Sequence, residues 1–245
     1  MSAPSIITID GPAGAGKSTL GEMLARRLGY LFFDTGVMYR ALAWAVLRHS
    51  IDPEDEEAVA ALVQRLDIHV QPPGDATDGR PYTVLVNGAD ATWELRHPEV
   101  ERIVSITARH PAVRAVLRNR QRAIGQRGRV VMVGRDIGSI VMPDAPLKIY
   151  LDASVDERAR RRTNEIRQRG GSADLQNIRN EIIRRDSLDR HVSAPATDAC
   201  IIVSDGLSPE QVVDLVVSRI DCEPGDTQDT RAYDRAKTSD SPGTR

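Results

Sequence analysis

Residues 11–19 read Gly-Pro-Ala-Gly-Ala-Gly-Lys-Ser-Thr, directly after the apolar run Ser5-Ile6-Ile7-Thr8-Ile9-Asp10. The spacing G-x-x-x-x-G-K-[ST] between a strand and a helix is that of a phosphate-binding loop. Backbone N–H groups in such a turn, together with the N-terminus of the next helix, surround phosphate oxygens. The stretch therefore predicts a nucleoside triphosphate site, in which Lys17 adds positive charge and Ser18 is a magnesium ligand. Its expected residues are Gly11, Pro12, Ala13, Gly14, Ala15, Gly16, Lys17, Ser18 and Thr19.

Outward from this loop, short apolar stretches alternate with helical periodicity. We expect strands at 5–10, 30–33, 129–133, 147–151 and 200–203, and helices at 17–28, 37–49, 53–66, 154–169, 174–185 and 208–220, with helical periodicity over 98–124. Strands that alternate with helices give a doubly wound parallel sheet, with ligands at the carboxyl ends of the strands. The expected fold class is therefore α/β.

Residues 67–95 differ from this alternation. Pro72-Pro73-Gly74 and Asn87-Gly88 are turn signals, and the stretches beside them suit short antiparallel strands. We expect one main domain over 1–220, with a core of about 5–66 and 97–220. A small β subdomain at about 67–96 is expected as an insertion, a short helical lid at about 154–170, and a disordered polar tail at 221–245.

Composition excludes several classes of protein. The 245 residues carry a formal charge of −2, which argues against a main role in binding nucleic acid polymers. The two cysteines show no pairing or zinc pattern, and no apolar run approaches the length of a membrane span. We expect a cytoplasmic protein with no membrane association.

Arginine motifs follow the strands after the phosphate-binding loop, whereas the guanine-reading Asn-Lys-x-Asp pattern of GTPases is missing from the sequence. In Asp34-Thr35-Gly36-Val37-Met38-Tyr39-Arg40, a hydroxyl and a guanidinium five residues apart suit an anion at a helix N-terminus. The alternative is a helix cap at Thr35 and a solvated charge at Arg40.

Two further motifs place charge near the same edge of the sheet. Gly134-Arg135-Asp136-Ile137-Gly138 follows an apolar strand, and the alternative to a site is a turn held by an Arg–Asp pair. Arg158-Ala159-Arg160-Arg161-Arg162 suits either a solvent-facing helix stripe or a lid that covers a transferring phosphoryl group.

Six motifs over about residues 5–220 together resemble the bacterial cytidylate kinases, which are P-loop nucleoside monophosphate kinases. They are GPAGAGKST, DTGVMYRA, NGADATWELRHPEV, HPAVRAVLRNRQR, GRDIGSIVMPDAPLKIYLDAS and RRDSLDR. The resemblance implies a monomeric enzyme that transfers a phosphoryl group from ATP to CMP or dCMP with Mg²⁺, in pyrimidine nucleotide metabolism.

The resemblance also implies roles for individual residues. Thr35, Arg40 and Arg135 would hold the acceptor phosphate; Ser105, Arg114 and Asp136 would read cytosine; Arg185 and Asp189 would hold the sugar; and Arg190 would contact the base. An acid suits cytosine because the base offers an exocyclic amino donor, whereas uracil would present a carbonyl to that acid. Lys17, Arg135, Arg158, Arg161 and Arg162 would stabilise the transferring phosphoryl group.

The sequence departs from the family pattern at three places. An acid is usual at the position of Val133, and the motif that follows Asp189 is compressed and shifted at 190–195. The segment Val203-Ser204-Asp205 lacks the usual acid at the end of its strand. Three alternatives therefore stay open. The chain could be another P-loop kinase of a small metabolite such as shikimate or gluconate, a UMP kinase, or a nucleotide-binding regulator without catalysis.

Overall fold

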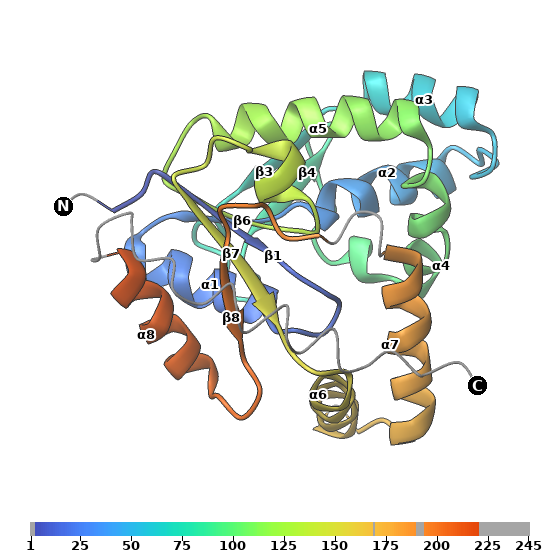
Figure 1. Cartoon of the computed structure of the whole chain (residues 1–245). Coiled ribbons are helices and arrows are strands. Elements are labelled where there is room, and N and C mark those ends of the chain that lie inside the picture. Colours follow the sequence, from blue (N-terminus) through green and yellow to red (C-terminus); the bar gives the residue numbers. More distant parts are fainter. Residues whose placement is uncertain (1–2, 169, 190–193, 221–245) are drawn as a thin grey trace, which may run out of the picture.

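The computed structural model describes residues 3–168, 170–189 and 194–220, and Figure 1 shows the chain from its N-terminus to its C-terminus. The predicted tail at 221–245 and Arg190 lie outside the described residues. The strands are β1 (Ile6–Asp10), β2 (Leu31–Asp34), β3 (Ile68–Gln71), β4 (Thr83–Val86), β5 (Ala89–Asp90), β6 (Val130–Val133), β7 (Leu147–Asp152) and β8 (Cys200–Val203). The helices are α1 (Lys17–Leu28), α2 (Gly36–Arg48), α3 (Glu56–Arg65), α4 (Pro98–Thr107), α5 (Pro111–Gly125), α6 (Val155–Gln168), α7 (Leu175–Asp189) and α8 (Pro209–Ile220).

Five strands form one parallel sheet in the order β2-β6-β1-β7-β8. Strand β6 is buried along its whole length, as is usual where helices cover both faces of a sheet. Successive side chains of β6 face opposite sides. A Cβ at Gly21 of α1 would meet Val133, whereas one at Gly125 of α5 would meet Met132, so α1 and α5 cover opposite faces. The α/β prediction is confirmed.

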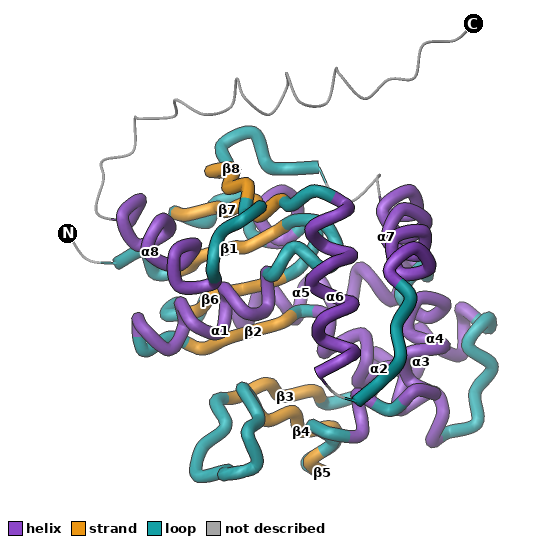
Figure 2. The backbone as a smooth tube through the Cα atoms, turned by 90° about the horizontal axis from the view of Figure 1, so that it is seen from below, coloured by secondary structure: helices purple, strands orange, loops and turns teal. Residues whose placement is uncertain are grey.

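A separate three-stranded antiparallel sheet, β3-β4-β5, lies between α3 and α4 in the chain and beyond the β2 edge of the main sheet (Figure 2). Asn87 and Gly88, between β4 and β5, both have positive φ values, of 50° and 81°. This conformation suits a tight hairpin turn, for which Asn-Gly is a strong signal. The ring of Tyr82 lies 5.7 Å from that of Phe32 on β2, which joins the small sheet to the core.

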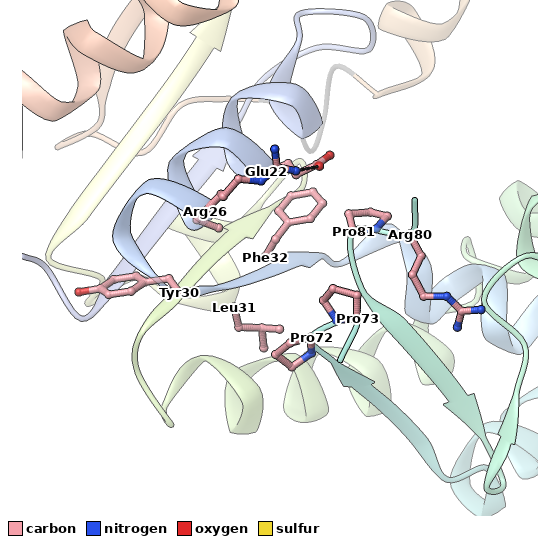
Figure 3. Close-up of a pocket in the computed structure, with 10 residues that line it drawn as sticks. Glu22, Arg26, Tyr30, Leu31, Phe32, Pro72, Pro73, Arg80 and Pro81 are labelled. Atoms are coloured by element: carbon pink, nitrogen blue, oxygen red, sulfur yellow. Dashed lines mark hydrogen bonds and ion pairs between the residues drawn. The ribbon is translucent and has the colours of Figure 1, made fainter. Parts of the chain in front are cut away.

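A cavity of about 200 Å³ lies beside that junction. Figure 3 shows Glu22 and Arg26 of α1, Leu31 and Phe32 of β2, and the prolines of the loop between β3 and β4 around it. The predicted site residues do not line this cavity, so the cavity is separate from the chemistry considered below.

Several elements differ from the sequence-based expectation, among them α3, which begins at Glu56 and not at 53. The stretch 98–124 forms two helices, because Pro111 has no N–H to donate and disfavours helical backbone at the preceding residue. His110 accordingly has an extended conformation, with φ −64° and ψ 121°. Helix α7 continues to Asp189, four residues beyond the expected end. In the described part of the chain, no helix is long and apolar enough to cross a membrane.

Candidate functional site

The phosphate-binding loop joins β1 to α1 at the carboxyl edge of the sheet. Gly11 has φ 143°, and a Cβ there would lie 2.0 Å from the carbonyl oxygen of Leu151, so the backbone passes too close to β7 for any side chain. Helix α1 begins at Lys17 without a side-chain cap and without an acidic residue in its first turn. Its N-terminus therefore keeps the partial positive charge that attracts phosphate.

Lys17 lies against its own loop. Its Nζ donates a hydrogen bond to the carbonyl oxygen of Pro12 at 2.6 Å. This contact holds the ammonium group beside the backbone that the sequence assigns to phosphate binding.

Ser18 and Asp34 bring two oxygen donors together next to this loop. Ser18 Oγ lies 3.4 Å from Asp34 Oδ2, while Asp34 Oδ1 accepts from the backbone N–H of Gly36 at 3.0 Å. The described residues contain no cluster of three or more metal-ligating His, Cys, Asp or Glu. Mg²⁺ needs no such cluster, since it is usually bound by one or two protein oxygens with phosphates and waters. The hydroxyl and carboxylate therefore fit Mg²⁺.

Asp10, at the end of β1, connects the phosphate-binding loop to the Gly-Arg-Asp motif. Its Oδ1 accepts from the N–H of Ile137 at 2.8 Å and its Oδ2 from the N–H of Gly138 at 2.7 Å. The side chain is buried, and burial raises its pKa to about 6. The backbone hydrogen bonds act in the opposite direction, as does the charge of Lys17, whereas Asp136 raises the pKa further.

Gly138 is required at the turn that Asp10 holds. A Cβ there would lie 2.8 Å from Thr8 Oγ1 and 3.3 Å from Asp10 Oδ2. The backbone then continues in a short π-helical turn over Ile137–Val141. Sequence reasoning did not select Asp10, although an acid at the end of a buried strand, directly before the loop, was a signal for it.

Asp136 accepts two charge-assisted hydrogen bonds from α5. Arg114 Nη2 and Arg118 Nη2 lie 3.0 Å and 2.9 Å from the same oxygen, Asp136 Oδ2. The guanidinium of Arg114 also lies over the ring of Tyr39, 5.9 Å from its centroid. The structure thus brings the predicted pair Arg114 and Asp136 into contact and adds Arg118, which sequence reasoning missed.

Of the residues predicted to hold the acceptor phosphate, Thr35 and Arg135 follow the ends of β2 and β6, and Arg40 lies in α2. Thr35 Oγ1 donates to the carbonyl oxygen of Val133 at 2.9 Å, which ties the end of β2 to the end of β6. Arg40 Nε donates to Glu101 Oε1 of α4 at 2.8 Å. Ser105 is exposed and lies four residues after Glu101, on the same face of α4. Arg135 is half-buried in the turn after β6.

The three lid arginines have different environments. Arg158 is buried: its guanidinium pairs with Asp186 of α7 at 2.6 Å and also donates to the carbonyl oxygen of Ala13 at 3.0 Å. Arg161 donates to the carbonyl oxygens of Ala15 and Ser204, at 3.2 Å and 2.6 Å.

Arg162 is half-exposed and pairs with Glu165 of its own helix at 2.7 Å. Two of the three predicted arginines are therefore anchored to backbone oxygens of the phosphate-binding loop. Arg185 and Asp189 lie in the last turn of α7, where their side chains are outside the described part of the chain.

Known proteins with similar sequences identify the family. The family model for cytidylate kinase matches residues 7–222. This chain belongs to the cytidylate kinase family. It is 81% identical over 232 residues to a cytidylate kinase of Roseiflexus castenholzii, which covers 95% of this chain and all of that protein. It is 60% identical over 219 residues to a cytidylate kinase of Chloroflexus aggregans, which covers 89% of this chain and 95% of that protein.

Among solved structures, a shikimate kinase from Bacteroides thetaiotaomicron covers 90% of this chain with 16% identity and a TM-score of 0.47. A similarity this low carries no information about the substrate.

Proposed function

We propose that this member of the cytidylate kinase family transfers the γ-phosphoryl group of ATP to CMP and dCMP, forming CDP and dCDP with Mg²⁺. The proposal rests on the family membership and on one observation, the carboxylate of Asp136 that accepts hydrogen bonds from two guanidinium groups at the carboxyl edge of the sheet. A carboxylate there accepts a hydrogen bond from the exocyclic amino group of cytosine. Uracil would present a carbonyl oxygen to the same group, and leaving a buried polar group unpaired costs about 1–3 kcal/mol.

We propose that Asp136 and Arg114 read the base, together with Ser105 of α4. Both hydrogen bonds that the Asp136 carboxylate accepts within the described residues end on Oδ2, which leaves Oδ1 for the base. Arg185, Asp189 and Arg190 are proposed for the sugar and the base on the evidence of sequence alone.

The phosphate of the acceptor is proposed to lie among Thr35, Arg40 and Arg135, at the ends of β2 and β6. Arg40 now pairs with Glu101, so a bound phosphate would compete with that carboxylate for the guanidinium. A forked guanidinium binds two phosphate oxygens at once, which fixes the direction of the acceptor as well as its place.

The donor half is proposed to use residues 11–19. The loop N–H groups and the N-terminus of α1 hold the phosphates, and Lys17 neutralises the charge that develops on the transferring group. Ser18 and Asp34 would hold Mg²⁺, which supplies further charge neutralisation when bound.

Arg158 and Arg161 are proposed to act partly by fixing the conformation of the phosphate-binding loop, since both donate hydrogen bonds to its carbonyl oxygens. Among the described contacts, Arg162 makes no hydrogen bond to the phosphate-binding loop and pairs with Glu165. We propose that it binds the transferring phosphoryl group when the lid, residues 154–170, is closed. Closure of the lid would exclude water, which would otherwise hydrolyse ATP.

A coupled assay with Mg²⁺ and ATP across CMP, dCMP, UMP, AMP and GMP tests the proposed activity. We expect CMP and dCMP to be the best acceptors, with kcat/KM for CMP at least about ten-fold above that for UMP. A purine monophosphate as the best acceptor would refute the assignment. Binding of ATP and CMP in calorimetry without turnover would instead favour a regulator without catalysis.

A further inference from the structure

Among the described residues, Arg114 and Arg118 pair with the Asp136 carboxylate, and neither the motifs nor the family resemblance assigns a role to Arg118. It lies one helical turn after Arg114 on α5, and its side chain is about a quarter exposed, like that of Arg114. Residues four apart share a helix face, so both guanidinium groups reach Asp136 from the same side. The carboxylate itself is only 10% exposed.

The two arginines do not have the same surroundings. Arg114 has a second neighbour, the ring of Tyr39, and a weak contact of Nη1 with the carbonyl oxygen of Ala108 at 3.5 Å. Arg118 donates only to Asp136, and its buried Nε has no hydrogen-bond partner in the described part of the chain. A buried donor left unpaired costs free energy, and among the described contacts it is the hydrogen bond to Asp136 that offsets this cost.

We infer that Arg118 determines acceptor specificity by fixing the Asp136 carboxylate, which leaves the guanidinium of Arg114 able to turn toward the base. This inference rests on the proposed function. With Oδ2 held by Arg118, the Oδ1 oxygen keeps its direction when Arg114 exchanges its hydrogen bond with Asp136 for one with the ring nitrogen or carbonyl of cytosine. Without Arg118, Arg114 would have to hold the carboxylate and read the base at once.

Electrostatics also favours a second guanidinium beside Asp136. Asp136 raises the pKa of Asp10, so the two carboxylates lie close enough to interact. The guanidinium groups of Arg114 and Arg118 place two positive charges beside the Asp136 carboxylate. Charge-assisted hydrogen bonds of this kind are roughly twice as strong as neutral ones.

Arg118→Met tests the inference, with Arg120→Met as the matched control. Arg120 lies on the same helix, but its guanidinium donates to the backbone carbonyl oxygens of Leu66 and Gln64, away from Asp136. For Arg118→Met we expect kcat/KM for CMP to fall about ten-fold, mostly through KM, while kcat/KM for UMP changes less than about two-fold. Arg120→Met should leave the CMP-to-UMP ratio at the wild-type value even where it lowers thermal stability.

Arg118→Lys provides the rescue measurement, since an ammonium group restores one charged donor to Asp136 without the planar fork. We expect its CMP-to-UMP ratio to lie between those of the wild type and Arg118→Met. The inference is overturned if Arg118→Met and Arg118→Lys keep the wild-type ratio, or if Arg120→Met lowers it equally. Failure of the wild-type chain to phosphorylate CMP would instead refute the proposed function, so the two outcomes are distinguishable.

Discussion

Asp10 connects the donor and acceptor halves of the candidate site through a single carboxylate. It ends the strand that leads into the phosphate-binding loop, and its two oxygens hold the backbone of Ile137 and Gly138 in the acceptor motif. Its pKa is raised by burial, lowered by Lys17 and raised by Asp136, so its charge responds to both halves. The N–H groups of Ile137 and Gly138 stabilise the charged form of this buried carboxylate.

Asp10→Asn should change how stability depends on pH. The pKa of Asp10 is about 6 in the folded chain, against an ordinary value of 3.8, so the folded state binds this proton more tightly than the unfolded state. Its contribution to the free energy of unfolding is therefore largest below about pH 4 and declines as pH rises through 6.

Urea unfolding of both proteins from pH 4 to 7.5 measures this effect. We expect the stability of the wild type relative to Asp10→Asn to fall by about 2 kcal/mol across the range. A difference that does not vary with pH would show that Asp10 has an ordinary pKa.

Helix α6 is the element whose role was hardest to predict from the sequence. Its arginines suit a solvent-facing stripe or a mobile lid equally well, because periodicity does not reveal which charge meets a partner on another element. Arg158 is buried against Asp186 and Ala13, whereas Arg160, two residues along, is exposed and pairs with Glu157 of its own helix. Glu157 accepts from both Arg160 and Arg161, which lowers its pKa to about 2.

Arg158→Met should therefore destabilise the chain much more than Arg160→Met. It removes the hydrogen bonds to the carbonyl oxygens of Ala13 and Ala153 and leaves Asp186 without its partner. Breaking a buried pair costs about 3–5 kcal/mol, whereas an exposed pair is worth about 0–1 kcal/mol. Denaturant unfolding measures both, and KM for ATP should rise only for Arg158→Met. Equal losses of stability would show that Arg158 does not anchor α6.

At the scale of the whole molecule, the candidate residues lie at or near the carboxyl edge of the five-stranded parallel sheet. The strand–loop–helix pattern at 5–28 predicted that edge, because phosphate-binding spacing and buried apolar runs depend on local sequence. The contacts across the edge were not predictable in the same way. Arg118 meets Asp136 because α5, which begins at Pro111, packs against the turn that follows β6. Family resemblance suggested Arg114 but gave no signal for Arg118.

The CMP-to-UMP ratio of kcat/KM in Asp136→Asn measures whether the Asp136 carboxylate selects cytosine. An asparagine keeps the shape of the side chain but can turn an amide N–H toward the carbonyl oxygen of uracil. We expect the ratio to fall by at least about ten-fold from the wild-type value, with UMP gaining relative to CMP. A ratio equal to that of the wild type would contradict the claim that this carboxylate selects cytosine.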